Sequence, residues 1–276
     1  MGDIGPILIT GCSSGIGAAT AKRLAERGHL VYATARQADT LAGLASAGCT
    51  TFALDVTDDA SMVGAVDAIV AEHGRVGALV NNAGYGEYGA VEDVALERVR
   101  RQFETNVFGL ARMCQLVLPS MRAAGTGRIV NIGSMGGRLT FPYGGYYHAT
   151  KHAVEALSDA LRYEVRPFGV RVILFEPGLI TTEFGNTVSG TLADTATKDS
   201  PYAAGTARMD SMIEGMYAST VLSVGPGAVA KAIEKSLTRR RPRTRYVVPA
   251  VTRSLIGARL VMPGRVWDAM LRTTVR

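Results

Sequence analysis

The stretch ILITGCSSGIG, residues 7–17, decides the fold that the sequence predicts. It begins with a short apolar run typical of a strand and continues through Gly11, Gly15 and Gly17 into the amphipathic segment IGAATAKRLAER. A glycine triplet alone is weak evidence, but a place between a first strand and a helix is typical of a dinucleotide-binding turn. The spacing here is G-x-x-x-G-x-G.

Glycines at this turn allow the backbone to bend tightly and to approach a pyrophosphate group. The helix N-terminus that follows offers free N–H groups and about half a positive charge. Ser13 and Ser14 add hydroxyl donors, and Ile16 opens the helix. We therefore predict a nucleotide-phosphate site over residues 11–17, and a glycine turn that serves only packing is the alternative.

Short β-branched runs alternate with longer amphipathic segments along the rest of the chain. The strand-like runs are residues 7–10, 30–35, 50–55, 78–82, 128–132, 170–176 and 245–249. Helix-compatible segments follow the first six, and apolar strands separated by helices are typical of a parallel sheet covered on both faces. Right-handed crossovers make such a sheet doubly wound. We predict an α/β fold with a seven-stranded parallel Rossmann-type sheet, in a single domain over residues 1–276.

Two segments differ from this pattern. Residues 183–225 are polar and small at first and then helix-like, and we expect a substrate loop there, because long loops in compact domains are usually functional or mobile. Met209, Met212 and Met216 in this segment suit either core packing or an apolar substrate lid. Residues 250–276 form a basic C-terminal extension.

The composition is typical of a soluble globular protein of a reducing compartment. Apolar residues make up 47% and charged residues 20% of the chain. Cys12, Cys49 and Cys114 are an odd number without metal-ligand spacing, so we expect them to act as small apolar residues. We see no signal-peptide pattern and no apolar run of about 18 residues. We expect a cytoplasmic protein without a transmembrane span or a metal site.

The positive charge is concentrated near the C-terminus. Residues 231–276 hold 12 Lys and Arg against two acids, within a net charge of +6 for the chain. The run RRRPRTR, residues 239–245, lacks interleaved aromatic residues and a nucleic-acid-binding motif, so we expect no nucleic-acid partner. A solvated basic face is the main interpretation, and peripheral membrane contact or an oligomer contact are the alternatives.

Further motifs accompany the glycine turn in a fixed order. They are NNAG at residues 81–84, the Asn106 of ETNVFG, the Ser134 of NIGS, YHATK at residues 147–151 and EPG at residues 176–178. Together they resemble the classical short-chain dehydrogenase/reductase family over roughly residues 5–250, and the joint match is far more specific than any single motif. The resemblance implies binding of NAD(H) or NADP(H) and hydride transfer.

The end of the second predicted strand indicates which cofactor is preferred. In this family, NAD-preferring members usually carry an acid there that binds the ribose 2′-OH, whereas this chain has Ala35 followed by Arg36. A guanidinium pairs with a 2′-phosphate through charge-assisted hydrogen bonds. We predict preference for NADP(H) over NAD(H), and an exposed Arg36 without this role is the alternative.

The resemblance implies several more cofactor contacts. Asp55 matches the residue that bonds the adenine amino group, with Val56 beside it, although a role near the N-cap of the next helix is open for Asp55. The pocket after the fourth strand and the loop over the nicotinamide would be formed by Asn82, Ala83, Gly84, Pro177, Gly178 and Thr182, with Thr182 at the carboxamide.

Proton transfer to the carbonyl oxygen must accompany hydride transfer, and a tyrosine four residues before a lysine suits this chemistry. Tyr147 and Lys151 share a helix face, whereas Tyr146 lies well off it. Lowering a tyrosine pKa from about 10 by about three units takes roughly 4 kcal/mol. A lysine ammonium about 4 Å away supplies a comparable amount at an effective dielectric near 20. We predict Tyr147 as the acid/base and Lys151 as the group that lowers its pKa.

Ser134 and Asn106 complete the predicted site. Ser134 follows a strand at the carboxyl edge of the sheet, where doubly wound sheets bind ligands, and its hydroxyl would orient the substrate oxygen. By resemblance, Asn106 holds a water in a proton relay that reaches Lys151, and Lys151 also bonds the nicotinamide ribose. Gly133 stands where a second serine is common in the family.

The predicted function is an NADP(H)-dependent oxidoreductase that interconverts a secondary alcohol and a ketone. Similarity of VYATAR and of the C-terminal region to the hydroxysteroid and retinol dehydrogenase branch favours an apolar, steroid- or lipid-like small-molecule substrate. A cofactor-binding regulatory protein without turnover and an isomerase or dehydratase on the same fold are the alternatives. The resemblance also implies a homodimer or homotetramer.

Overall fold

A seven-stranded parallel sheet forms the centre of the computed structural model, which describes residues 4–195, 199–219 and 221–275. The strands run in the order β3-β2-β1-β4-β5-β6-β9. Their bounds are β1 Ile7–Ile9, β2 Val31–Ala35, β3 Thr50–Ala53, β4 Ala78–Asn81, β5 Gly127–Ile132, β6 Val170–Pro177 and β9 Arg245–Val248. Each neighbouring pair is parallel, so the predicted doubly wound sheet is confirmed.

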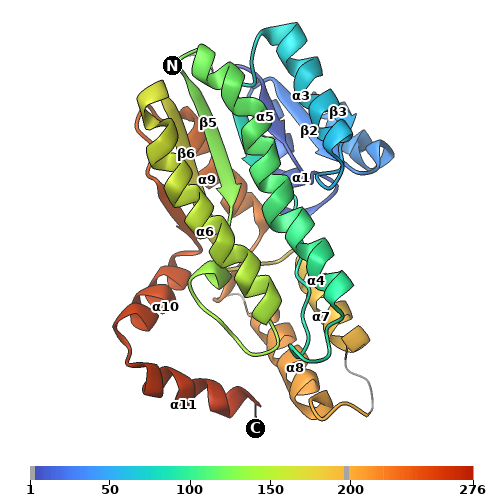
Figure 1. Cartoon of the computed structure of the whole chain (residues 1–276), viewed down its shortest axis with the longest axis vertical. Helices are drawn as coiled ribbons and strands as arrows, with labels where there is room; N and C mark the ends of the chain where they lie inside the picture. Colours follow the sequence, from blue (N-terminus) through green and yellow to red (C-terminus); the bar gives the residue numbers. More distant parts are fainter. Residues whose placement is uncertain (1–3, 196–198, 220, 276) are drawn as a thin grey trace.

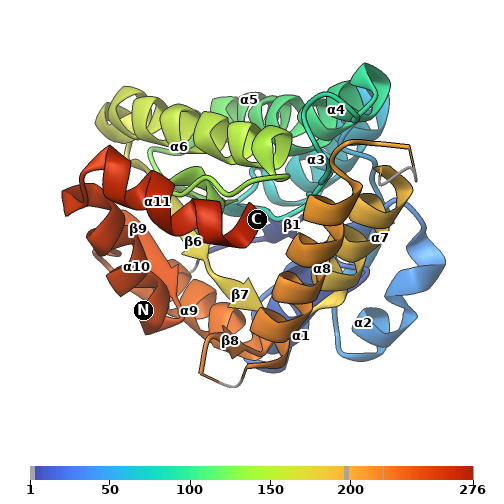
Figure 2. The same ribbon diagram turned by 90° about the horizontal axis from the view of Figure 1, so that it is seen from below.

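Helices cover both faces of the sheet (Figure 2). One layer holds α1 (Gly15–Glu26), α2 (Ala42–Ser46) and α9 (Pro226–Thr238), and the other holds α3 (Asp59–His73), α5 (Leu110–Ala123) and α6 (Gly145–Val165). Successive side chains of a strand point to opposite faces of the sheet, so each strand contributes to the core under both helix layers. In β1, Ile7 and Ile9 pack into the cluster of the first layer, whereas Leu8 packs into the cluster of the second.

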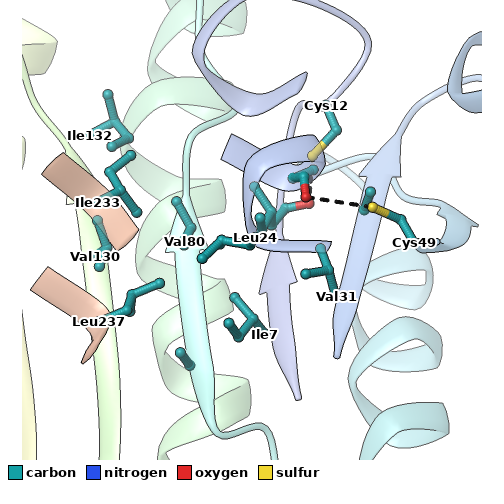
Figure 3. Close-up of a cluster of buried hydrophobic side chains, with 14 of the residues drawn as sticks. Ile7, Cys12, Leu24, Val31, Cys49, Val80, Val130, Ile132, Ile233 and Leu237 are labelled. Carbon is teal, nitrogen blue, oxygen red and sulfur yellow. Dashed lines mark hydrogen bonds between the residues drawn. The ribbon is translucent and has the colours of Figure 1, made fainter. Parts of the chain in front are cut away.

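The cysteines belong to this core. Cys12 and Cys49 lie in the first cluster beside Leu24 and Val31 (Figure 3), and the Cys49 thiol donates to the Ala21 carbonyl oxygen at 3.7 Å. Cys114 lies in the second cluster, and all three thiols are free and buried. Burial raises the pKa of Cys12 and Cys114 to about 12, so these thiols stay protonated. They act as small apolar side chains, as predicted.

The segment 183–225 is helical in both halves, whereas we expected a polar loop first and a helix-like part only after it. It holds α7 (Glu183–Thr195) and α8 (Ala203–Ala218), and its residues 196–198 and 220 lie outside the described part. Val188 and Leu192 pack against Met209 and Ile213, so each helix buries an apolar face in the other. The small strands β7 (Leu179–Ile180) and β8 (Ser223–Val224) tie the two ends of the segment together.

The C-terminal extension forms two further helices, α10 (Ala250–Val261) and α11 (Gly264–Val275). Both lie beyond the carboxyl ends of the strands and project from the main body (Figure 1). Trp267 and Ile256 anchor them by packing on Leu139. The remaining elements are the short helices Ala38–Leu41, Met135–Gly137 and Arg166–Phe168, α4 (Leu96–Phe103) and the π-helical turn Glu104–Gly109.

An ion network joins the edge strand β9 to α6. The Arg245 guanidinium binds the carboxylates of Glu155 and Glu176 through Nη1 and reaches Asp159 Oδ2 at 2.7 Å through Nη2. Burial raises the pKa of Glu155 to about 7, and the hydrogen bond from Arg245 opposes this rise. Because Glu155 and Asp159 lie on α6, the network holds that helix against the sheet.

We expect Arg245→Ala to lower the free energy of unfolding by about 3–5 kcal/mol, because it leaves buried carboxylates without their main cation. Urea unfolding measures the difference. Arg243→Ala is the matched control, because this neighbouring arginine is exposed and its loss should change stability by no more than about 0.5 kcal/mol. Equal losses in the two variants would contradict a structural role for the network.

Candidate active site

A cavity of about 1370 Å³ opens at the carboxyl edge of the sheet. Loops after β1, β2 and β3 line one part of it, and residues of α7 and α8 line another. Ligands bind doubly wound sheets at this edge. The predicted site residues that line the cavity are Gly11, Ser13, Ser14, Gly15, Ile16, Arg36, Asp55, Val56, Asn82, Ala83, Gly84, Ser134, Tyr147, Lys151, Pro177, Gly178 and Thr182. Gly17 and Asn106 lie behind its wall.

The glycine turn is shaped by close backbone contacts. Gly11 has φ +71°, and a Cβ there would lie 2.8 Å from the Ala83 Cα atom. A Cβ on Gly17 would collide with the Gly11 carbonyl oxygen and lie 2.5 Å from Asn82 Nδ2. The turn therefore needs glycine at both positions, and it leaves the N-terminus of α1 open toward the cavity.

Asn82 and Thr10 hold the turn against the end of β4. Asn82 Nδ2 donates to the carbonyl oxygens of Thr10 and Gly11, both at 2.9 Å. Thr10 Oγ1 accepts from the backbone N–H groups of Asn82 and Ala83, both at 3.0 Å. These four bonds satisfy backbone groups that the sheet leaves unpaired where β1 and β4 end. Asn82 thus supports the glycine turn as well as lining the cavity.

Arg36 and Asp55 lie where β2 and β3 end. Arg36 is exposed at the cavity rim, directly after the last residue of β2. Asp55 Oδ1 accepts from the backbone N–H of Thr57 at 2.9 Å and from its hydroxyl at 2.8 Å. The N-cap of α3 is Asp58, whose side chain accepts from Ala60 and Ser61. Asp55 thus forms a local turn in the N-cap region of α3, and its contact with the adenine stays a prediction.

Asn106 sits in the π-helical turn between α4 and α5 and is buried. Its Nδ2 donates to the Tyr85 carbonyl oxygen at 2.9 Å and to Thr150 Oγ1 at 3.1 Å, and its Oδ1 accepts from Tyr85 N–H at 3.1 Å. A Cβ on Gly84 would lie 3.0 Å from Asn106 Oδ1 and 3.7 Å from Lys151 Nζ. Asn106 therefore fixes the wall next to the lysine.

Ser134, Tyr147 and Lys151 meet where β5 ends and α6 begins. Ser134 follows β5, and its Oγ accepts from Gly136 N–H at 3.0 Å. Lys151 Nζ donates to the Ile132 carbonyl oxygen at 3.0 Å and lies 5.8 Å from the centre of the Tyr147 ring. Tyr146 turns away, because its hydroxyl donates to the Val91 carbonyl oxygen at 3.1 Å. The structure thus places Tyr147, and not Tyr146, beside the lysine.

Burial shifts the pKa values of both Tyr147 and Lys151. It raises the pKa of Tyr147 above its usual range, although a hydrogen bond with Ser134 opposes the rise. Burial also lowers the pKa of Lys151 to about 8. We expected the lysine to lower the tyrosine pKa, and the structure differs, because burial of the phenol is the largest influence on this pKa and raises it. Tyr147 is therefore held as a neutral phenol.

The loop after β6 closes the cavity above the glycine turn. Pro177 ends β6, and Gly178 packs so closely that a Cβ would collide with Thr252 of α10. Thr182 lies over Gly15, since a Cβ on that glycine would meet Thr182 Cβ at 3.4 Å. Thr182 Oγ1 accepts from Phe184 N–H at 3.3 Å. This loop therefore brings α7 over the site.

Several cavity residues carry no sequence motif. The rings of Tyr88 and Phe184 pack on Tyr147 with centroids 5.4 and 5.5 Å away. His148 lies beside them, with Nδ1 at 3.0 Å from the Gly136 carbonyl oxygen. Burial lowers the pKa of His148 to about 4, so the imidazole is neutral. Alignment of the rings depends on contacts between distant segments, so the sequence could place residues 183–225 near the site but could not identify these rings.

The donor set around the cavity suits an organic cofactor rather than a metal ion. In the described ranges, no group of three or more His, Cys, Asp or Glu side chains is arranged to hold a metal. The cradle of free N–H groups at α1, by contrast, fits a phosphate group. A phenol and an ammonium lie at the far end of the same cavity. These features define a dinucleotide-dependent oxidoreductase of the doubly wound α/β class.

The chain belongs to the short-chain dehydrogenase family, whose model matches residues 6–192. It is 39% identical to the 3-ketodihydrosphingosine reductase of Bacteroides thetaiotaomicron, over 91% of this chain and 90% of that protein. It is 33% identical to the NADPH-dependent 3-dehydrocapnine reductase of Ornithobacterium rhinotracheale, over 95% of this chain and 94% of that protein. The protein is an oxidoreductase that acts on CH–OH or ketone groups.

Solved structures of the family bind either nicotinamide dinucleotide. A serine dehydrogenase complexed with NADP⁺ matches 90% of this chain and 95% of its own with a TM-score of 0.77 and 30% identity. A Burkholderia phymatum member in complex with NAD matches 94% of this chain and 95% of its own with a TM-score of 0.80 and 25% identity. A nicotinamide cofactor is therefore supported for this chain.

We expect Gly17→Ala to weaken NADPH binding at least tenfold, because the new methyl group would push the Gly11 carbonyl into the phosphate cradle. Titration of cofactor fluorescence measures the dissociation constant. Gly64→Ala in α3 is the control, because a Cβ there meets nothing within 4 Å. Unchanged affinity in Gly17→Ala would contradict the placement of the phosphates at this turn.

Proposed function

We propose that the protein is an NADPH-dependent reductase that converts an apolar, lipid-like ketone to a secondary alcohol. The observation that carries this proposal is a single cavity that joins the glycine cradle, the Tyr147 phenol and an apolar wall from α8. The reverse reaction uses the same groups. Two curated relatives with reductase names support the direction.

NADP(H) preference rests on Arg36 at the rim of the cradle. The position before it is Ala35, so the strand end presents a cation and no carboxylate to the ribose. A guanidinium binds a phosphate through bidentate charge-assisted hydrogen bonds. When bound, the cofactor supplies the hydride. The chain's part is to hold the phosphates at residues 11–17 and the adenine near Asp55 and Val56.

Tyr147 is the proposed proton donor to the carbonyl oxygen. Its pKa lies above the usual range, so the phenol is protonated throughout the neutral pH range, as reduction of a ketone requires. Ser134 orients the same oxygen with its hydroxyl. Lys151, with a pKa of about 8, is mostly an ammonium at neutral pH and favours the phenolate that remains after transfer. By resemblance to the family, Asn106 holds a water in the relay that returns a proton to Lys151.

The apolar wall supports a lipid-like substrate. The side chains of Met209, Met212, Ile213 and Met216 on α8 line the cavity. Met209 and Ile213 are buried in the apolar cluster between α7 and α8, and Met212 and Met216 pack against it. The methionines therefore contribute both to this cluster and to the cavity wall. Unbranched thioether side chains adapt to flexible apolar ligands. A relative named for 3-ketodihydrosphingosine is consistent with this wall.

The cellular location and the oligomeric state complete the proposal. Free, buried thiols favour the reducing cytoplasm. Among the described helices, none is long and apolar enough to cross a membrane. Resemblance to the family favours a homodimer or homotetramer.

Replacing Arg36 by aspartate should lower the NADPH/NADH ratio of kcat/KM by about 100-fold, because an ion pair becomes a repulsion at the 2′-phosphate. Steady-state kinetics with both cofactors measure the ratio. Arg27→Asp serves as a control, because this exposed arginine at the end of α1 does not line the cavity. An unchanged ratio in Arg36→Asp would refute the assignment.

Turnover tests the function itself. With NADPH, we expect 3-ketodihydrosphingosine to be reduced with a kcat/KM at least about tenfold above that of small ketones, because the apolar wall of α8 binds an alkyl chain. Tyr147→Phe should lower kcat by at least about 100-fold, because it removes the proton donor. Absorbance of NADPH follows both effects.

Tyr146→Phe is the matched control for the phenol. The Tyr146 hydroxyl donates to the Val91 carbonyl oxygen, away from the lysine, so this variant should keep nearly full turnover. Similar losses in both variants would exclude Tyr147 as the specific donor. Tight NADPH binding with no turnover of any ketone in a panel of ketosteroids, retinoids, quinones and lipid ketones would favour the regulatory alternative.

A further inference from the structure

The turn between α10 and α11 exposes an unusual group of large apolar side chains. Leu260 is 68% exposed, Val261 84% and Val266 52%, all within seven residues of the chain. Both helices project from the main body beyond the carboxyl edge of the sheet (Figure 1). Single exposed apolar residues are normal on a protein surface, whereas a contiguous group marks a site of contact.

These side chains are not the anchor of the two helices. Trp267 and Ile256 are buried against Leu139, and the Arg259 guanidinium lies 5.3 Å from the centre of the Trp267 ring. Leu260, Val261 and Val266 are not part of this anchor and face solvent. Replacement of Leu260 or Val261 should leave the packing of α10 and α11 intact.

Exposed apolar side chains also lie at the mouth of the active-site cavity. Val251 and Leu255 on α10 are partly exposed and also line the cavity. Leu222, just before β8, is likewise exposed and lines the cavity, and its neighbour Val221 is 75% exposed. Exposed apolar side chains therefore occur both at the turn between the two helices and at the cavity that Tyr147 lines.

Positive charge accompanies this surface. Arg253, Arg265 and Arg272 are exposed on the two helices, whose sequence holds one acid, Asp268. Apolar side chains flanked by arginines complement an anionic lipid surface, where the chains enter the interface and the guanidinium groups bind headgroups. A second copy of this chain would instead have to bury these like charges against each other.

The basic run RRRPRTR lies elsewhere. Its residues 239–243 come before β9, at the amino edge of the sheet, whereas α10 and α11 follow β9 at the carboxyl edge. The positive C-terminal region therefore divides into two groups at opposite ends of the molecule. Only the second group is adjacent to exposed apolar residues and to the cavity.

We propose that α10, α11 and the segment Val221–Leu222 form a docking surface for an anionic lipid bilayer, with the cavity mouth facing the membrane. The protein binds the interface without spanning it. Docking itself is independent of turnover. Supply of an apolar ketone directly from the bilayer into the cavity rests, in addition, on the proposed function.

Vesicle flotation of the full chain tests the docking. We expect binding to vesicles of phosphatidylcholine and phosphatidylglycerol at roughly 3:1, with much weaker binding to pure phosphatidylcholine and a loss at high salt. The double variant Leu260→Asp, Val261→Asp should bind the anionic vesicles at least about tenfold more weakly, because two inserted side chains become anions. Absence of binding by the unmodified chain would overturn the proposal.

The triple variant Arg239→Ser, Arg240→Ser, Arg241→Ser is the charge control. It removes three positive charges at the amino edge, and we expect it to lose less than about threefold in vesicle affinity. A loss as large as that of the double variant would overturn the proposal. Circular dichroism confirms that both variants are folded.

Two readouts separate the remaining explanations. Tyr147→Phe should float with the vesicles as the unmodified chain does, so docking can succeed even where the proposed reaction fails. Light scattering without lipid gives the mass of the double variant. If the substitutions dissociate an oligomer, a second copy covers this surface and the membrane proposal is wrong; an unchanged mass supports it.

Discussion

A buried chain of hydrogen bonds fixes α6 to the sheet, and the position of the active site depends on it. Asn81 Nδ2 on β4 donates to Asn131 Oδ1 on β5 at 3.0 Å, and Asn131 Nδ2 donates to Ser158 Oγ on α6 at 2.9 Å. Buried amides are costly unless they are paired, so one register of helix on sheet is favoured. Because Tyr147 and Lys151 also lie on α6, this register fixes their position relative to the sheet.

Local signals explain why much of the fold and site could be predicted from the sequence. A glycine turn between strand and helix, and a tyrosine four residues before a lysine, each depend on spacing within one short segment. In 183–225 the helix-like second part was expected, but α7 was missed, because its apolar face is buried against α8. The raised pKa of Tyr147 was missed for the same reason, since its burial comes from the distant rings of Tyr88 and Phe184.

Two asparagines support the cofactor-binding turn and the groups that we propose to react. Asn82 lines the cavity while its amide holds the glycine turn, and Asn106 holds Tyr85 and Thr150 behind the wall that Lys151 faces. A group satisfied by fixed protein partners needs little reorganisation when charge develops nearby. The two asparagines thus contribute rigidity, whereas Tyr147 and Lys151 are the groups that we propose to transfer protons.

Topology also determines where the C-terminal helices lie. Because β9 is parallel to the other strands, the chain must leave it at the carboxyl edge, beside the cavity, and the loop before it must lie at the amino edge. Helices added after β9 therefore meet the cavity mouth, where Val251 and Leu255 become part of its wall. An apolar helix pair at this point can change how a substrate enters the cavity without altering the groups that react with it.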